Sequence, residues 1–323
     1  MIISQTPYRV SFAGGGTDLP AFYQQEYGAV LSMATAHHMY VTVHQRFEDS
    51  FRIAYSKVET CRRIVDIRHE LVREALQICG IRDLLEVTTI GDVPGGTGMG
   101  SSSTLTVGLL NAFYAYQGRI VSPHQLAEEA CRIEIDVLGK PIGRQDQYAA
   151  AVGGLNYIRF NPDDTVEVHP VPCRVEVLDE LERRALVIYT DRQRDADQIL
   201  GKQKEGTSDR MSELRAMRDL AGTMRQSISA GDLDEFADLL HEGWQIKRSM
   251  GMGISDSWID QWYDTARRAG ATAGKILGAG GGGFLLLLAP PEHHEAIRDA
   301  LGRPRERNLQ IDRAGSRIIF IGT

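Results

Sequence analysis

One short segment of the sequence consists almost entirely of glycine and serine. Residues 94–103 read PGGTGMGSSS and offer few side chains that could pack in a core. Such a run loses much backbone entropy on folding and gains little apolar burial in return. Because glycine lets main-chain N–H groups approach a ligand closely, the segment could cradle an anion, usually a phosphate. A plain glycine-rich turn is the alternative.

The position of this segment favours the phosphate interpretation. Residues 85–90 (LEVTTI) are typical of a strand, and the apolar residues of 101–116 recur at helical spacing. The positive end of a helix dipole would therefore face the loop. A Walker A loop would need lysine where Ser101 stands, and GGTGMG lacks the spacing of a dinucleotide fingerprint, which disfavours a nicotinamide oxidoreductase. A triphosphate held here would need Mg²⁺, with a hydroxyl of Ser101, Ser102 or Ser103 as a ligand.

A carboxylate is predicted to point inward from the next helix. This helix, 123–138, follows the cap sequence Ser-Pro-His-Gln that starts at Ser122. Its predicted apolar stripe consists of Leu126, Ala130, Ile133, Val137 and Leu138. Glu134 lies four residues from Ala130 and from Leu138, so it falls within that stripe. An inward carboxylate is costly unless it is paired or binds a metal, and both a salt bridge and metal ligation remain open.

Two further acids lie beside glycine turns. Asp146, in GRQDQYAA, starts a predicted short helix, where an N-cap is the common role of aspartate. It could also return to the pocket of Glu134 and act as the base that accepts a hydroxyl proton in phosphoryl transfer. In TPYRVSFAGGGTDLP, predicted strand residues carry Arg9 and lead through three glycines to Asp18. Asp18 is either a turn former or a ligand for sugar hydroxyls.

A second glycine cluster lies in KILGAGGGGFLLLL, between two predicted strands of the second half. It holds more glycines than a hairpin needs. Close approach to a ligand or to another loop explains it better.

The composition limits the class of protein. The chain has 323 residues, 42% hydrophobic and 24% charged, with a formal net charge of -7. This balance argues against non-specific binding to nucleic acid or to an anionic membrane. No apolar run is long enough to span a bilayer, and we expect no secretory signal because the N-terminus lacks a basic start followed by an apolar core. Four dispersed cysteines favour a reduced, cytoplasmic chain without structural zinc. The oligomeric state stays open, a homodimer being one option.

The order of predicted elements indicates two domains. Strands dominate the first sixty residues, and a charged, turn-prone region spans 161–184. The second half opens with a strand (ALVIYT), is mostly helical to about 249, and closes with strands and a helix. We therefore expect a two-domain α+β protein, with domains at 1–175 and 176–323.

Taken together, these segments resemble the GHMP kinase superfamily. The motifs that carry the resemblance are PYRVSFAGGGTD (7–18), PGGTGMGSSS (94–103) and KILGAGGGGF (275–284). Their order and separation fit nearly the whole chain. The resemblance implies a ribosomal S5 domain 2-like N-terminal domain and a ferredoxin-like C-terminal domain, with ATP and substrate between them.

The resemblance also implies roles for single residues. Ser102 and Glu134 become Mg²⁺ ligands, Asp146 the base, and Arg9 a neighbour of the reacting hydroxyl. The expected contacts to ATP are Pro94, Gly95, Gly96, Thr97, Gly98, Met99, Gly100, Ser101, Ser102 and Ser103. The expected contacts to substrate are Gly15, Gly16, Thr17, Asp18, Gly280 and Gly281.

The substrate is expected to be a sugar phosphate. Gly15 and Gly16 replace the Glu-His pair of galactokinases, and the motifs look most like those of D-glycero-D-manno-heptose 7-phosphate kinases of bacterial surface-polysaccharide pathways. The predicted reaction is ATP-dependent phosphorylation of the anomeric hydroxyl to the 1,7-bisphosphate. The alternatives are a fucokinase-like or other sugar 1-kinase, and a non-catalytic sugar sensor. Cationic candidates for the 7-phosphate are Arg144, Arg192 and Arg194.

Overall fold

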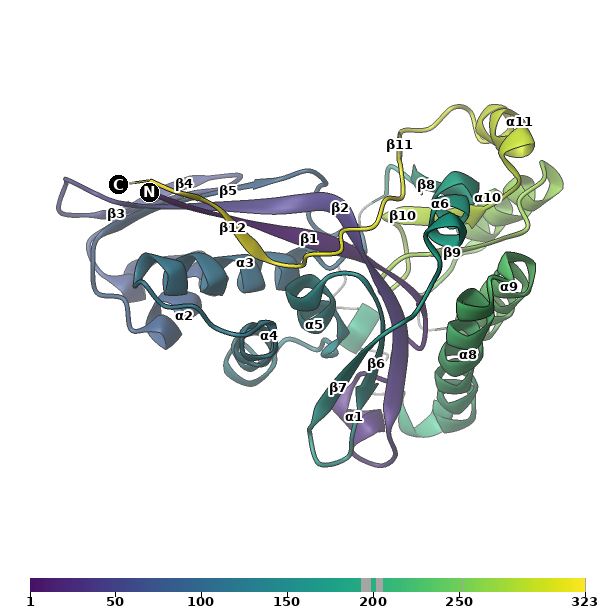
Figure 1. Cartoon of the computed structure of the whole chain (residues 1–323), viewed down its shortest axis with the longest axis horizontal. Helices are drawn as coiled ribbons and strands as arrows, with labels where there is room; N and C mark the ends of the chain where they lie inside the picture. The colour runs from purple at the N-terminus through teal and green to yellow at the C-terminus, as the bar shows by residue number, and fades with distance from the viewer. Residues whose placement is uncertain (193–198, 202–205, 252, 323) are drawn as a thin grey trace.

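The strands form two sheets, one of eight strands and one of four (Figure 1). The computed structural model describes residues 1–192, 199–201, 206–251 and 253–322. The larger sheet contains β1 (Ile2–Ala13), β2 (Gly28–Gln45), β3 (Phe51–Ala54), β4 (Val58–Cys61), β5 (Leu85–Gly91), β6 (Leu155–Phe160), β7 (Val166–Pro170) and β12 (Arg317–Ile321). The smaller sheet contains β8 (Ala185–Tyr189), β9 (Ala273–Ile276), β10 (Phe284–Leu288) and β11 (Glu306–Arg307). The α+β prediction is confirmed.

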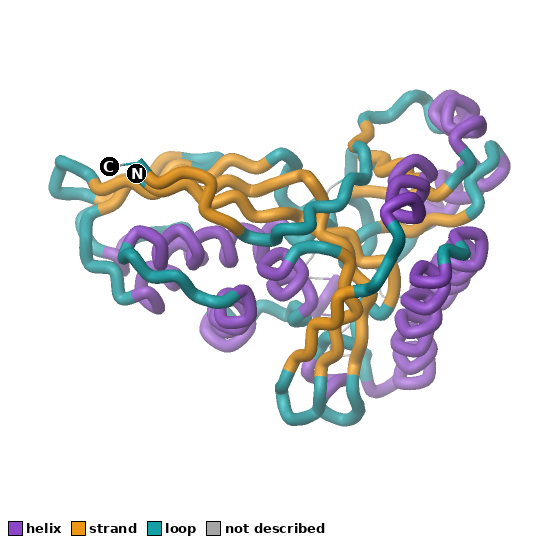
Figure 2. Tube along the Cα trace, in the orientation of Figure 1, coloured by secondary structure: helices purple, strands orange, loops and turns teal. Residues whose placement is uncertain are grey.

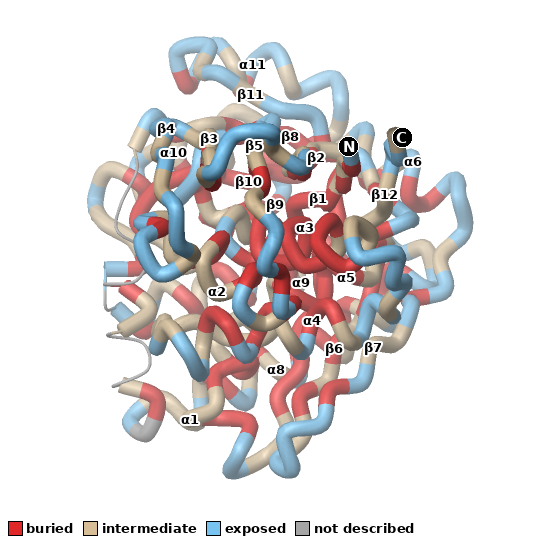
Figure 3. The backbone as a smooth tube through the Cα atoms, turned by 90° about the vertical axis from the view of Figure 1, so that its left-hand side faces the viewer, coloured by how far each residue is buried: buried red, intermediate tan, exposed pale blue. Residues whose placement is uncertain are grey.

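The helices lie against the sheets (Figure 2), and among the strand pairs of the described residues only β3 and β5 are parallel. The α-helices with described bounds are α1 (Pro20–Tyr23), α2 (Glu70–Cys79), α3 (Ser101–Tyr116), α4 (Pro123–Cys131), α5 (Gln145–Val152), α6 (Val175–Arg184), α8 (Met211–Ala230), α9 (Leu233–Ser249), α10 (Ser257–Arg268) and α11 (His294–Ala300). Helices α2, α3, α4 and α5 lie on one face of the larger sheet. α3 runs through the buried centre of the molecule (Figure 3).

The last strand of the chain belongs to the first sheet. β12 pairs antiparallel with β1, so that Ile321 lies opposite Ile2. The segment before it is fixed by Asp312, whose Oδ2 lies 2.6 Å from His38 Nε2 and 2.8 Å from Arg317 Nη1. The sheet that residues 1–175 build therefore also contains a strand from the end of the region that we expected as the second domain.

The smaller sheet has the strand order β11-β8-β10-β9, and all its pairs are antiparallel. Helices α8 to α10 connect β8 to β9, and α11 connects β10 to β11. This β-α-β-β-α-β succession matches the ferredoxin-like arrangement that the resemblance implies.

A shared hydrophobic core joins the two sheets. One cluster of buried side chains takes Tyr8 and Phe12 from β1 and Phe236 from α9, together with Leu286 from β10. The rings of Phe12 and Phe236 meet edge to face, with centroids 5.2 Å apart. Because burial of apolar area dominates folding free energy, this cluster holds the two units in one arrangement. No helix of the described residues combines the length and apolarity that crossing a membrane requires.

The helix expected at 123–138 starts and ends as predicted but changes form near its end. Ser122 caps it, accepting from the main-chain N–H of Gln125 at 3.1 Å. Beyond α4 the chain continues as a π-helix from Arg132 to Val137. The expectation that Val137 lies in the buried stripe was wrong, because its side chain is 49% exposed. The wider turn rotates the residues that follow it.

Candidate active site

The glycine-serine segment forms the loop that leads into α3. Gly96, Gly98 and Gly100 have positive φ angles of 72°, 83° and 78°, a conformation that glycine adopts without Cβ strain. Gly100 is the N-cap of α3, so the first N–H groups of this helix open toward the loop. These glycines and the three serines 101–103 line the same pocket. The pocket can therefore receive an anion at main-chain amides and hydroxyls.

Two side chains of this segment point away from the pocket. Thr97 and Met99 are buried. Thr97 Oγ1 donates to Pro94 O at 2.8 Å, and Met99 O accepts from the main-chain N–H of Arg9 at 3.1 Å. These residues therefore give the loop its shape through their side chains and main chain.

The second glycine cluster packs against the first loop. A Cβ added at Gly98 would lie 2.3 Å from Leu277 O, and one added at Gly283 would lie 2.3 Å from Thr97 O. The main-chain N–H of Phe284 donates to Thr97 O at 3.2 Å. The excess of glycine in this cluster thus corresponds to close approach to another loop, one of the two explanations considered from the sequence.

Glu134 is fully buried in the π-helix, and its side chain contacts the first turn of α3. Its Oε1 accepts a hydrogen bond from Ser102 Oγ, and its Oε2 accepts one from Gln147 Nε2 at 2.7 Å. Burial raises the pKa of this carboxyl to about 7 against the opposing effect of these hydrogen bonds. No ion pair of Glu134 with a basic side chain occurs in the described part of the chain.

The donor set at Glu134 fits Mg²⁺. The described residues contain no group of three or more His, Cys, Asp and Glu side chains that could enclose a metal. Mg²⁺, however, is commonly held by one or two protein oxygens, with substrate phosphates and water completing its coordination. A hydroxyl and a carboxylate in direct contact, beside a phosphate-binding loop, provide such a pair in Ser102 and Glu134.

Arg9 and Asp146 form the centre of the site. Arg9 Nε and Nη2 donate to the two carboxylate oxygens of Asp146, each at 2.6 Å, and Arg9 Nη1 donates to Gly98 O at 2.6 Å. The Arg9 side chain is 5% exposed and that of Asp146 22%. Asp146 lies in the first turn of α5 and is not its N-cap, a position that Arg144 occupies. The paired geometry orients the carboxylate toward the loop.

Asp18 is the second acid of the site and is almost completely buried. Its Oδ1 accepts from the main-chain N–H of Gly16 at 2.9 Å, and its Oδ2 accepts from Gln145 Nε2 at 3.0 Å. Burial, and secondly the charge of Asp146, raise the pKa of Asp18 above its ordinary value. A Cβ at Gly143 would lie 1.9 Å from Asp18 Oδ2, so glycine is required there for the close approach.

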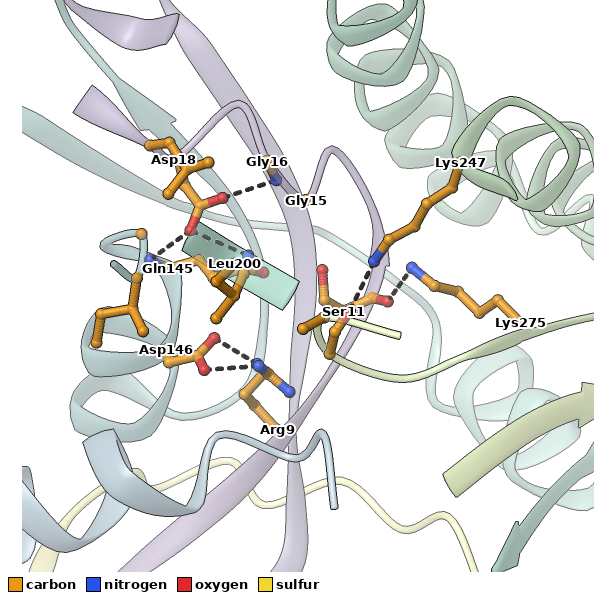
Figure 4. A pocket seen from close by; sticks show the side chains of 15 residues that line it. Arg9, Ser11, Gly15, Gly16, Asp18, Gln145, Asp146, Leu200, Lys247 and Lys275 are labelled. Carbon is orange, nitrogen blue, oxygen red and sulfur yellow. Dashed lines mark hydrogen bonds and ion pairs between the residues drawn. The ribbon is translucent and has the colours of Figure 1, made fainter. Parts of the chain in front are cut away.

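Two pockets meet at the Arg9–Asp146 pair. The first contains the glycine-serine loop, and the second contains Asp18 and Gln145. Both pockets are lined by Arg9 and Asp146. Figure 4 shows the second pocket, where Asp18, Gln145 and Asp146 lie on one side and two lysines reach in from the other. We call the first the loop pocket and the second the acid pocket.

The arginines that we expected at the substrate lie elsewhere or outside the described residues. Arg144 Nη1 donates to Asp164 O at 2.7 Å, and its side chain lines a separate pocket with Tyr23. Arg192 pairs with Asp256 at 3.0 Å and is not part of the acid-pocket lining. Arg194 lies outside the described residues.

The glycines expected at the substrate divide into two groups. Gly15 and Gly16 line the acid pocket. The main-chain N–H of Gly281 donates to Ile254 O at 2.8 Å, and a Cβ at Gly280 would lie 2.6 Å from the same oxygen, so these two pack against a neighbouring loop. Thr17 is buried, and its Oγ1 donates to Gly14 O and Ala29 O. These hydrogen bonds fix the first glycine turn.

Sequence reasoning missed several polar residues of the acid pocket. These are Ser11, Gln145, Lys247 and Lys275. Lys275 Nζ donates to Ser11 O at 2.7 Å and to Phe12 O at 3.0 Å, which ties β9 to β1. Lys247 could have been found by the reasoning used for Glu134, because it follows the buried Leu240 and Trp244 at helical spacing.

Comparison with known proteins finds relatives along nearly the whole chain. Residues 63–154 match the GHMP kinases N terminal domain, and residues 224–306 match GHMP kinases C terminal. D-glycero-alpha-D-manno-heptose 7-phosphate kinase of Campylobacter jejuni is 30% identical over 293 residues, which are 86% of either chain. The bifunctional fucokinase/GDP-fucose pyrophosphorylase of Arabidopsis thaliana is 25% identical over 304 residues, 85% of this chain and 28% of that one. The crystal structure of a D-glycero-D-manno-heptose 1-phosphate kinase from Bacteroides thetaiotaomicron has a TM-score of 0.84 at 26% identity and covers 100% of both chains.

Proposed function

This chain belongs to the GHMP kinase family and is an ATP-dependent kinase, and on that premise we propose that it phosphorylates the anomeric (C1) hydroxyl of D-glycero-D-manno-heptose 7-phosphate. The product would be the 1,7-bisphosphate, an intermediate for nucleotide-activated heptose of bacterial surface polysaccharides. Two relatives with heptose phosphate in their names support this choice of sugar. Those names differ in the position of the phosphate, so the position of transfer is part of the proposal.

One observation carries the proposal: the loop pocket and the acid pocket open onto the same Arg9–Asp146 pair. A nucleotide whose phosphates lie on the glycine-serine loop would place its terminal phosphoryl group beside that pair. A sugar held by Asp18 and Gln145 would present a hydroxyl from the other side. Phosphoryl transfer depends mainly on such positioning and on charge stabilisation.

Each residue of the pair has a defined role in this proposal. Asp146 accepts the proton of the attacking hydroxyl, because each carboxylate oxygen retains a lone pair beyond its bond to Arg9. Arg9 holds the carboxylate in place and stabilises negative charge on the transferred group. Asp18 orients sugar hydroxyls through the oxygen atoms that face the acid pocket.

Ser102 and Glu134 would hold Mg²⁺ against the nucleotide phosphates. When bound, the metal ion supplies positive charge that neutralises the phosphate oxygens. Gln147 keeps the second oxygen of Glu134 in position, so the carboxylate can face Ser102 without rearrangement.

A panel of free and phosphorylated sugars tests the proposal. The purified protein is incubated with ATP and Mg²⁺ and with heptose, heptose 7-phosphate, fucose or galactose, and ADP release is measured. We expect the highest kcat/KM with heptose 7-phosphate, and a product whose new phosphate is lost on mild acid treatment, as expected of an anomeric phosphate. Preference for fucose would support the fucokinase alternative, to which the plant relative corresponds. Sugar binding without ADP release would support the sensor alternative.

A further inference from the structure

Lys247 is a buried cation that faces the acid pocket from the side opposite to Asp18 (Figure 4). Its residue is 6% exposed, and its Nζ donates to the carbonyl oxygen of Gly278 at 2.6 Å. No salt bridge of Lys247 with a carboxylate occurs among the described residues; Asp18 and Asp146 act on it only over longer distances. A buried ammonium group with a neutral acceptor alone is incompletely compensated, so an anion would bind there favourably.

The position of Lys247 separates it from the nucleotide side of the site. It does not line the loop pocket, whereas Arg9 and Asp146 do. It lines instead the acid pocket and a smaller adjoining pocket that shares Gly15 and Gly16 with it. The adjoining pocket is also lined by Arg210, which already pairs with Glu213 at 3.3 Å. A ligand with its reacting hydroxyl at Asp146 would therefore extend away from the nucleotide toward Lys247.

A second polar group of the acid pocket is the hydroxyl of Ser11. Ser11 is 6% exposed, and its Oγ has no hydrogen-bond partner among the residues that the structure describes. Ser11 lines the acid pocket beside Lys247, as Figure 4 shows. Buried hydroxyls are nearly always hydrogen-bonded, so this atom indicates that a polar ligand group belongs there.

We propose that Lys247, with Ser11 beside it, binds the phosphate group that the sugar substrate carries before the reaction. This inference rests on the proposed function and names the residue that makes the enzyme select a sugar phosphate over the free sugar. A charge-assisted hydrogen bond from the lysine to a phosphate oxygen supplies the discrimination.

The other basic residues are less suited to this role. Lys275 uses its ammonium group to join Ser11 O and Phe12 O, and burial lowers its pKa well below the ordinary value of lysine. Arg144 and Arg192 do not line the acid pocket. Burial lowers the pKa of Lys247 only to about 8, so this side chain is protonated in most protein molecules at neutral pH.

The test compares Lys247→Met with wild type on heptose 7-phosphate and on unphosphorylated heptose, with ADP release as the readout. Because a hydrogen bond to a charged group contributes about 1.5–3 kcal/mol, we expect KM for the phosphorylated sugar to rise about 10–100-fold. KM for free heptose and for ATP should change little. Arg192→Gln is the matched control, and its effect should be equal for the two sugars because Arg192 pairs with Asp256.

A kcat loss of equal size on both sugars would overturn the inference, since Lys247 would then act on the transferred phosphoryl group or on the fold. Calorimetric titration of heptose 7-phosphate without nucleotide separates this inference from the proposed function. Tight binding to wild type and at least tenfold weaker binding to folded Lys247→Met supports the inference even if no ADP is released. Equal binding to the two proteins overturns it even if the kinase reaction is confirmed. Near-UV circular dichroism establishes that the variant is folded.

Discussion

Arg9 and Asp146 are far apart in the sequence but are joined by two hydrogen bonds of 2.6 Å. The fork of the guanidinium group matches both oxygens of the carboxylate, which fixes the direction in which Asp146 faces the pocket. Both side chains border the loop pocket and the acid pocket. The pair therefore marks the point at which phosphoryl donor and acceptor would meet.

Asp146→Asn tests the role of the base. The amide keeps the size of the side chain but cannot take up a hydroxyl proton, so kcat should fall by about 10²–10⁴-fold. ATP affinity, measured by titration calorimetry, should stay within a few-fold of wild type. Turnover near the wild-type rate would exclude Asp146 as the base.

Glu134→Gln tests the proposed metal ligand. An amide next to Ser102 binds Mg²⁺ more weakly than a carboxylate does. Loss of a residue that only supports a metal ligand already lowers metal affinity by roughly tenfold or more, so loss of a direct ligand should raise the Mg²⁺ concentration for half-maximal activity by at least roughly tenfold. The rise in melting temperature that Mg²⁺ and ATP produce together should shrink in parallel. An unchanged Mg²⁺ dependence would leave Glu134 as a structural residue only.

Gly98→Ala tests the contact between the two glycine loops. Gly98 has a φ of 83°, and an added Cβ would lie 2.3 Å from Leu277 O. Gly96 is a matched control, because its φ is 72° and nothing lies within 4 Å of an added Cβ. Gly96→Ala should lower the free energy of unfolding by about 1–2 kcal/mol, the cost of a left-handed alanine. Gly98→Ala should cost clearly more in the same urea titration, whereas equal losses would mean that the loops can separate at no cost.

The pH dependence of KM tests the charge on Lys247. Burial, and secondly the charge of Arg9, lower the pKa of Lys247 to about 8, while Asp18 and Asp146 oppose this effect and Lys275 and Arg210 are the other cations nearby. Because the protonated lysine binds phosphate, KM for the sugar phosphate should rise as pH increases through about 8. A phosphate monoester is already a dianion there, with its second pKa near 6, so the ligand does not cause the change. KM for free heptose should stay flat, and a parallel rise for both sugars would exclude this explanation.

The sequence predicted the parts of the site that lie in local patterns. Glu134 was located by its place in an apolar stripe, and the glycine-serine segment by its position before a helix. Lys247 was not found, because a lysine in a mostly polar helix looks like a solvated residue unless its neighbours are read at helical spacing. The directions of Arg144 and Arg192 could not be predicted, since the sequence around an arginine does not show which carboxylate or carbonyl its side chain contacts in the fold.

The sequence pattern also could not predict which sheet the last strand joins. The expectation that the second half closes with strands is confirmed for residues 317–321, but an apolar run does not show which sheet edge the strand joins. Their place beside β1 depends on tertiary contacts such as those of Asp312 with His38 and Arg317.

The pairing of β12, near the end of the chain, with β1 at its start has a consequence for biosynthesis. A nascent polypeptide that has emerged only as far as β7 leaves Ile2 to Gln5 of β1 without their antiparallel neighbour on one side. Unpaired strand edges are templates for association between chains. The larger sheet thus stays incomplete until residue 321 leaves the ribosome, and during that interval its open edge is exposed to pairing with another chain.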